Sequence, residues 1–89
     1  MIRKKITICN KLGLHARASM KLVNLAERFQ SEILLIHKNR EVNAKSIMSL
    51  MVIGAPCGTT IELTAEGADE TKAMTAVAEL ITNKFGENE

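Results

Sequence analysis

The sequence predicts an α+β protein in which three helices cover one face of a four-stranded antiparallel sheet, in the order βαββαβα. Segments with alternating apolar and polar residues indicate strands that are buried on one face, and segments with apolar residues at helical spacing lie between and after them. Gly, Pro and Asn separate these segments. Because 89 residues suffice for one compact core, we expect a single domain over residues 1–89. It should be an open-faced sandwich, with the other face of the sheet in water.

A strand followed by a helix is expected at the start of the chain. Isoleucines alternate with basic and hydroxyl residues over 2–8, which is the period of a strand with one buried face. Turn-forming residues over 10–14 end this pattern, and helical spacing begins at or next to His15. The expected apolar face of this helix consists of Ala16, Ser19, Leu22, Val23, Ala26 and Phe29.

The middle of the chain predicts a hairpin and a short helix. The apolar residues 33–36 precede turn-forming residues at 38–40 and a brief second strand at 41–43. Ser46 is expected to cap the next helix, because its hydroxyl can accept a hydrogen bond from an amide two or three residues later. The helix should cover residues 47–53 and end at the glycines and proline that follow.

A fourth strand and a last helix should complete the fold. Residues 61–65 alternate between apolar and polar, and Gly67 closes the strand. The acidic residues at 69–70 suit the positive end of a helix dipole. The helix should run to about Phe85, with Gly86 as its stop. Its expected apolar face consists of Ala73, Val77, Leu80 and Ile81.

Composition and charge argue against several classes of function. Twelve Lys and Arg against ten Asp and Glu leave a net charge of +2, and the chain has no Trp or Tyr, so we expect no nucleic-acid binding. No stretch approaches the roughly 20 apolar residues that span a bilayer, so we expect no membrane insertion and a cytoplasmic location. Pairing of the first and fourth strands would bring Cys9 near Cys57, but we expect both thiols to stay reduced, with no metal site and no cofactor.

His15 is the candidate reactive residue. Gly13 and Leu14 deliver it to the first turn of a helix, where amides without intrahelical partners favour a bound phosphate. Arg17 can offer charge-assisted hydrogen bonds to phosphate oxygens. Because phosphorylated imidazole is a reactive donor, the arrangement suits a carrier with a phosphohistidine intermediate, and no Walker loop, carboxylate pair or metal-ligand set indicates an independent catalyst. His37, in the hairpin, is expected to have only a surface role.

Residues 13–17 (GLHAR) and 43–51 (NAKSIMSLM), together with the order of the elements, resemble the HPr family of phosphocarrier proteins. The resemblance implies that Enzyme I, which draws on phosphoenolpyruvate, phosphorylates His15 on Nδ1. It further implies that the group passes to an EIIA-type domain and that Arg17 stabilises the phosphate. Residues 18–19 are Ala-Ser in place of the family's common Pro-Ala, a change that restores an amide and removes no donor.

The same resemblance implies a regulatory site and a surface for partners. Relatives with a similar Lys-Ser-Ile-Met segment are phosphorylated by HPr kinase/phosphorylase, so Ser46 is a candidate regulatory site as well as a cap. An exposed apolar patch suits transient docking of a monomeric carrier on several partners, whereas the alternative is that its residues all belong to the core. The expected partner-binding residues are Ala16, Met20, Ile47, Met48 and Met51, with Leu50 inside.

Two other functions stay open. The chain can instead be a regulator of the nitrogen-branch NPr type, which docks on partners according to its phosphorylation state. A small ligand-binding domain would need a concave apolar pocket, for which so small a core leaves little room. The carrier function requires that the ring of His15 be exposed at the amide end of the first helix.

Overall fold

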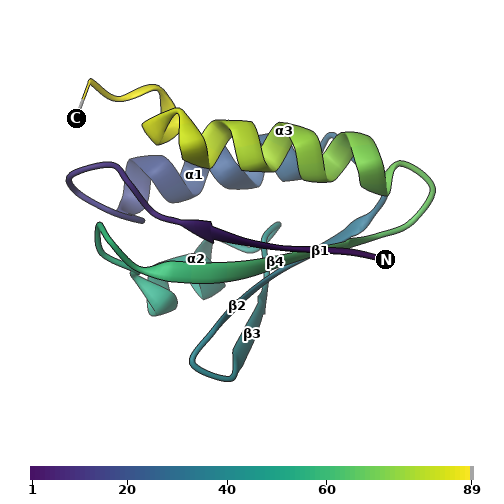
Figure 1. Cartoon of the computed structure of the whole chain (residues 1–89), viewed down its shortest axis with the longest axis horizontal. Coiled ribbons are helices and arrows are strands. Elements are labelled where there is room, and N and C mark those ends of the chain that lie inside the picture. Colours follow the sequence, from purple (N-terminus) through teal and green to yellow (C-terminus); the bar gives the residue numbers. More distant parts are fainter. Residues whose placement is uncertain (89) are drawn as a thin grey trace.

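The computed structural model describes residues 1–88, and its elements follow the expected order (Figure 1). The four strands form one antiparallel sheet in the order β1-β4-β2-β3, covered on one face by the helices α1, α2 and α3. The elements are β1 (Ile2–Thr7), α1 (Ala16–Ala26), β2 (Glu32–His37), β3 (Arg40–Asn43), α2 (Ile47–Ile53), β4 (Thr60–Glu66), α3 (Glu70–Thr82) and the 3-10 turn η1 (Lys84–Gly86). The predicted open-faced sandwich is therefore confirmed.

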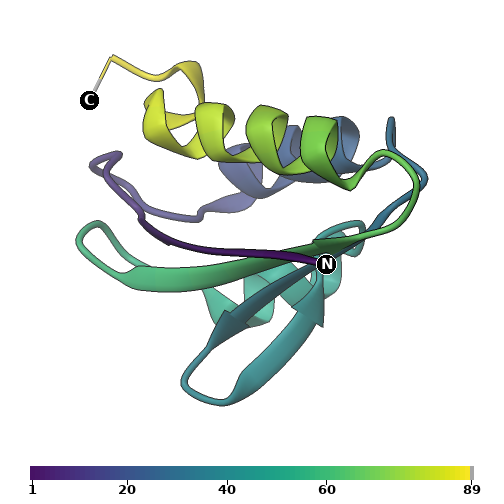
Figure 2. The same ribbon diagram turned by 45° about the vertical axis from the view of Figure 1, so that its right-hand side comes forward.

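The helices pack on the sheet and on one another. Helices α1 and α3 contact each other, and α3 also packs on β1 and β4 (Figures 1 and 2). The short helix α2 packs against α1 and β3. Because α2 contacts α1, the starts and faces of these two helices contribute to one surface of the protein.

The hairpin between β2 and β3 has a two-residue turn. Lys38 and Asn39 both have a positive φ, 51° and 65°, which is the conformation of a type I′ turn. His37 pairs with Arg40 directly across this turn. A turn of this hand matches the right-handed twist of the strands, so the predicted hairpin forms with a tight connection.

The core lies between the sheet and the helices and is built from aliphatic side chains. The fully buried larger residues are Ile8, Leu22, Ile33, Leu35, Leu50, Ile61, Leu63, Val77, Ile81 and Phe85. The predicted apolar face of α1 is correct for its buried members Ser19, Leu22, Val23 and Ala26. It is wrong for Ala16, which is exposed because it lies outside the face that α1 turns toward the core, while Ala18 is buried instead. Phe29 lies beyond the end of α1 and is half-buried against the core.

The predicted end of the last helix is also wrong. Helix α3 ends at Thr82, three residues before the expected position. Lys84 and Phe85 have φ values of 58° and 57°, which cannot continue a right-handed helix. The chain therefore turns back, and Phe85 becomes fully buried instead of ending an amphipathic face. Figures 1 and 2 show the segment that follows α3 lying over the loop between β1 and α1.

Both cysteines are free thiols. Gly58 donates its backbone N–H to the carbonyl of Ile8, at 2.7 Å, so the backbones of Cys9 and Cys57 lie next to a paired position. The Sγ of Cys9 lies 3.5 Å from the carbonyl oxygen of Ile81, at the end of α3, while Cys57 is exposed. The two thiols thus have different surroundings although the segments that carry them lie beside each other.

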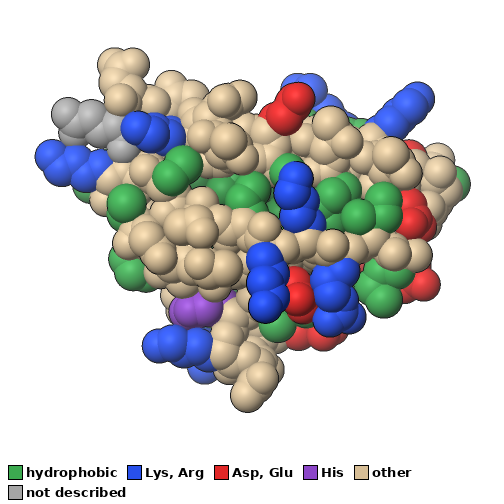
Figure 3. Space-filling view, in the orientation of Figure 1, with side chains coloured by type: hydrophobic (Ala, Val, Ile, Leu, Met, Phe, Trp, Pro, Cys, Tyr) green, Lys and Arg blue, Asp and Glu red, His purple; other side chains and the backbone are tan. Residues whose placement is uncertain are grey.

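The side chains over β1 and β4 carry mixed charge. Arg3 donates a hydrogen bond of 3.1 Å to Glu62 across these strands. Figure 3 shows Lys and Arg side chains lying beside Asp and Glu side chains on this face. Among residues 1–88, no helix combines the length and the apolar character needed to cross a membrane.

Candidate functional site

The loop between β1 and α1 is held rigidly where it leads into His15. Gly13 has a φ of +68°, and a Cβ atom there would lie only 2.5 Å from the carbonyl oxygen of Ala55. Leu14 is buried and donates its N–H to that same oxygen, at 2.8 Å. The side-chain amide of Asn10 donates to the carbonyl of Gly13, at 2.7 Å. Only glycine fits this close approach, and the contacts together fix the position of His15.

His15 is the N-cap residue of α1. Its extended backbone (φ −82°, ψ −178°) precedes the helix, and the first helical hydrogen bond runs from the N–H of Ser19 to the carbonyl of His15, at 2.8 Å. The ring nitrogen Nδ1 accepts a hydrogen bond of 3.2 Å from the N–H of Arg17. The side chain is 27% exposed. The ring is therefore partly open to solvent, beside amides that precede the helical hydrogen-bond pattern.

The other ring nitrogen of His15 contacts a residue from the far end of the chain. The Nε2 atom lies 2.5 Å from Oε2 of Glu87, which is 72 residues away in sequence. Asn10 donates its amide to the other carboxylate oxygen of Glu87, at 3.1 Å. Sequence reasoning missed both Glu87 and Asn10, because nothing in the residues around them indicates such a distant contact.

The carboxyl group of Glu87 favours its ionised form. Burial raises the pKa of Glu87, but hydrogen bonds from Asn10 and His15 and the nearby positive charge of Lys21 outweigh this effect, so the net pKa lies below the ordinary value. Glu87 is consequently a carboxylate at neutral pH. A carboxylate accepts hydrogen bonds and cannot donate them.

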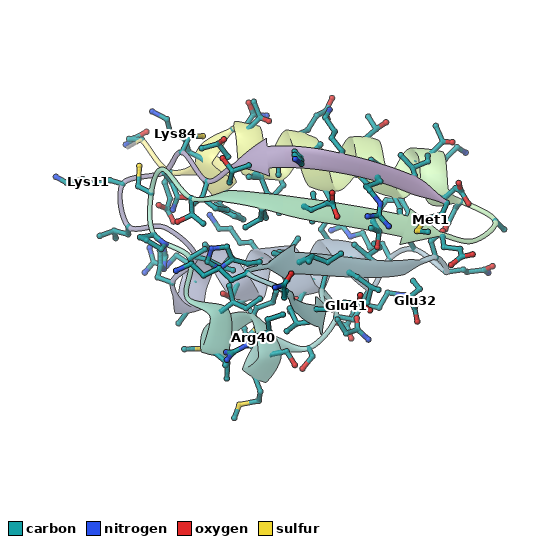
Figure 4. All side chains as sticks on the ribbon, turned by 60° about the horizontal axis from the view of Figure 1, so that its bottom comes forward. Met1, Lys11, Glu32, Arg40, Glu41 and Lys84 are labelled. Atoms are coloured by element: carbon teal, nitrogen blue, oxygen red, sulfur yellow. The ribbon has the colours of Figure 1, made fainter. Side chains whose placement is uncertain are left out.

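An open hollow of about 740 Å³ lies beside the ring. Arg17 is exposed in it, and its guanidinium group forms no ion pair with any residue in 1–88. Lys11 and Lys84 lie at this end of the molecule, opposite to Met1 (Figure 4). The lining consists of Lys11, Leu12, His15, Ala16, Arg17, Glu87 and Asn88. The hollow therefore combines a histidine with basic side chains, which suits an anion such as a phosphoryl group.

Ser46 occupies the predicted cap position of α2. Its Oγ accepts a hydrogen bond of 3.4 Å from the N–H of Ser49, and its own N–H donates to the carbonyl of Asn43, at 3.0 Å. The helix ends at Gly54, whose φ of 52° gives the left-handed conformation common at helix ends. Ser46 is half-buried, and its hydroxyl is part of the helix start.

Methionine side chains are exposed on α1 and α2. Met20 and Met51 are each 49% exposed and Met48 is 73% exposed. We call these three residues the methionine patch. Leu50 is fully buried, as expected, whereas Ile47 is half-buried and packs against the core. Sequence reasoning did not single out two further exposed apolar residues, Leu12 and Val52.

The sequence matches the family model described as "PTS HPr component phosphorylation site" over residues 2–83. Phosphocarrier protein HPr of Neisseria meningitidis is 51% identical over 89 residues, which cover 100% of both chains. Phosphocarrier protein NPr of Shewanella violacea is 40% identical over 86 residues, covering 97% of this chain and 94% of that protein. The crystal structure of HPr-C-His from Thermoanaerobacter tengcongensis matches with a TM-score of 0.96 and 45% identity, covering 100% of both chains. The chain thus belongs to the HPr family of phosphocarrier proteins of the phosphotransferase system.

Proposed function

We propose that His15 accepts a phosphoryl group on Nδ1 from Enzyme I and passes it to an EIIA-type domain. The observation that carries this proposal is the partly exposed ring at the start of α1, with Nδ1 facing the N–H of Arg17 at 3.2 Å. Membership in the HPr family supports the role of a phosphocarrier. The assignment to His15 follows from the chemistry of its surroundings, because a phosphate at a helix start finds amide donors and a favourable dipole.

The groups of this chain that take part in the transfer lie beside His15. The lone pair on Nδ1 attacks the phosphorus atom, and the bond between phosphorus and the donor breaks with its electron pair leaving on the donor. The N–H of Arg17, which donates to Nδ1 in the unphosphorylated protein, can then donate to a phosphoryl oxygen. The exposed guanidinium group of Arg17 adds a positive charge. In the next transfer the acceptor attacks phosphorus and the electron pair returns to Nδ1.

Labelling with Enzyme I and phosphoenolpyruvate tests the assignment. The protein should take up an acid-labile label, and the His15→Ala variant should take up none. His37→Ala is the matched control, since the chain has only two histidines and His37 lies at the end of β2, next to a hairpin turn and not to a helix start. Label on the His15→Ala variant, or its loss from the His37→Ala variant, would refute the proposal.

Ser46 is the proposed regulatory site. A phosphate on its Oγ would lie beside the first amides of α2, where negative charge is stabilised. Helix α2 contacts α1 and carries two members of the methionine patch, so the added charge would lie next to the proposed docking surface. HPr kinase/phosphorylase with ATP should label the protein and not the Ser46→Ala variant. The Ser49→Ala variant should keep the label, and equal labelling of both variants would contradict the assignment.

The methionine patch is the proposed docking surface for Enzyme I and EIIA-type domains. Flexible, exposed apolar side chains can repack against different partners, which suits a carrier that must release each one. Ala16 and Ile47 border it through their places at the starts of α1 and α2. A Met48→Glu variant should raise the KM for transfer from Enzyme I. An unchanged KM would show that partners bind elsewhere.

A docking function of the NPr type is the second candidate. The exposed patch favours it, and the NPr of Shewanella violacea is among the relatives of this chain. The His15→Ala variant separates the two functions, because a regulator that acts by binding alone keeps its activity, whereas a carrier loses all transfer. We expect a monomer in both cases.

A further inference from the structure

We propose that Glu87 is a positioning residue for His15. Its carboxylate keeps the ring proton of His15 on Nε2, and this leaves Nδ1 as the nucleophile. This inference rests on the proposed function and adds a residue to it. The contact joins the start of α1 to the chain beyond α3, across 72 positions of sequence.

The two nitrogens of His15 have partners of opposite kind. A neutral imidazole has one nitrogen that donates a hydrogen bond and one that accepts. The N–H of Arg17 can only donate, so Nδ1, at 3.2 Å, must accept. The carboxylate of Glu87 can only accept, so Nε2, at 2.5 Å, must donate. Both contacts select the same tautomer, and the contact with Glu87 is the shorter one.

The carboxylate of Glu87 is held in place before any transfer. The buried ring of Phe85 anchors the preceding turn, and Lys21 donates to the carbonyl of Phe85, at 2.7 Å. The N–H of Glu87 donates to the carbonyl of Lys84, at 2.9 Å. Asn10 donates to the carboxylate, at 3.1 Å. A group fixed by such contacts loses little entropy when it orients the ring.

Asn10 links this carboxylate to the loop that carries His15. Its side-chain nitrogen donates both to Glu87 and to the carbonyl of Gly13. The two acceptors fix the orientation of the buried amide, and its oxygen has no hydrogen-bond partner among the described residues. The same side chain therefore holds both the turn before His15 and the acceptor behind its ring.

Glu87 also suits the charge that develops during transfer. When the lone pair on Nδ1 of His15 forms the bond to phosphorus, the ring keeps its proton on Nε2 and becomes positively charged. The carboxylate of Glu87 lies at that proton and balances the charge. When the electron pair returns to Nδ1 on transfer to the acceptor, the ring is neutral again with the same tautomer. No proton has to move in either step, and the carboxylate acts as the aspartate of a serine-protease triad does when it orients an imidazole.

Nitrogen NMR of the labelled ring tests the tautomer directly. The unmodified protein should show His15 with the proton on Nε2. In the Glu87→Gln variant, Asn10 still donates to the side-chain oxygen, so the new NH₂ group faces Nε2. Only the 3.2 Å contact with the N–H of Arg17 then favours a proton on Nε2, so the fraction of rings with the proton on Nδ1 should rise. Glu79→Gln is the matched control, because it removes the same charge from an exposed position on α3. An unchanged tautomer in the Glu87→Gln variant would overturn the proposal.

Transfer rates complete the experiment. Labelling of the Glu87→Gln variant by Enzyme I should slow by about tenfold to a hundredfold. Removing the hydrogen-bond partner of a metal-ligating histidine has an effect of this size. The Glu79→Gln variant should keep the rate of the unmodified protein. If the unmodified protein takes no label, the proposed function fails, whereas equal rates with a label on both proteins refute only the role of Glu87. A slower rate with an unchanged tautomer also refutes this role.

Discussion

Replacing Gly13 by Ala tests whether a close backbone contact holds His15 in place. Gly13 combines a φ of +68° with a backbone approach in which a Cβ atom would lie 2.5 Å from the carbonyl oxygen of Ala55 and 2.7 Å from Cα of Pro56. Gly58 has a φ of +91° but nothing within 4 Å of the same atom. Gly58→Ala therefore introduces the backbone strain without the collision, and the pair of variants separates the two effects.

The expected cost follows from these two effects. A positive φ costs a residue with a side chain roughly 1–2 kcal/mol, and this applies to both variants. Overpacking adds about 1–3 kcal/mol at Gly13 alone, because the colliding atoms belong to the backbone and cannot rotate away. Gly13→Ala should thus lower the free energy of unfolding by about 1–3 kcal/mol more than Gly58→Ala. In a domain of this size that difference lowers the melting temperature by at least about 4 °C.

Chemical and thermal denaturation of the two variants measure the difference. Since the backbone has to move to relieve the contact, Gly13→Ala should also slow labelling of His15 at temperatures where the variant stays folded, and Gly58→Ala should not. Equal destabilisation of the two variants, with equal labelling rates, would refute the argument that this contact positions the histidine.

Three further predictions concern the second helix and the acid stability. Leu50→Ala should lower the free energy of unfolding by about 2–5 kcal/mol, whereas Met48→Ala should change it by no more than about 0.5 kcal/mol. Equal losses for the two variants in chemical denaturation would mean that Met48 is packed in the core. Ser46→Ala should cost about 0.5–2 kcal/mol through loss of the cap, and an unchanged unfolding midpoint would contradict the capping role. Hydrogen bonds from the side chain of Ser31 and from backbone amides lower the pKa of Asp69 below its ordinary value of 3.8. The charged form of Asp69 therefore stabilises the fold above that pH, and this stabilisation is lost as the pH falls through the folded-state pKa. The loss of unfolding free energy in Asp69→Asn should thus become smaller in acid. A loss that is the same at every pH would contradict the effect of the Asp69 charge on stability.

Most elements are predictable because their signals are local. The alternation of apolar residues identifies β1 and β4, and the turn residues before β3 identify the hairpin. The hydroxyl of Ser46 and the left-handed Gly54 mark the two ends of α2 as expected. Each of these signals comes from residues within a few positions of one another, where backbone preference and burial agree.

The C-terminal turn escapes prediction because its cause is not local. Lys84 and Phe85 adopt a positive φ that residues with side chains rarely take. Because neither position is a glycine, the sequence does not indicate the turn there. Burial of Phe85 compensates for the strain, and burial of this kind depends on the whole core. Asp69 shows a related limit, because its predicted place at the start of α3 is correct, but its carboxylate accepts hydrogen bonds from Gln30 and Ser31 and does not cap its own helix.

The candidate site therefore divides into a part that sequence reveals and a part that only the fold creates. His15 and Arg17 lie two positions apart, so the contact to Nδ1 arises wherever this segment begins a helix. The contact to Nε2 needs the reversal at Phe85, because a helix continued to that position would carry Glu87 away from the loop. Core packing around Phe85 consequently affects the orientation of the His15 ring as well as the stability of the fold. A substitution that loosens this turn should thus impair the orientation of His15 even when it leaves the first helix unchanged.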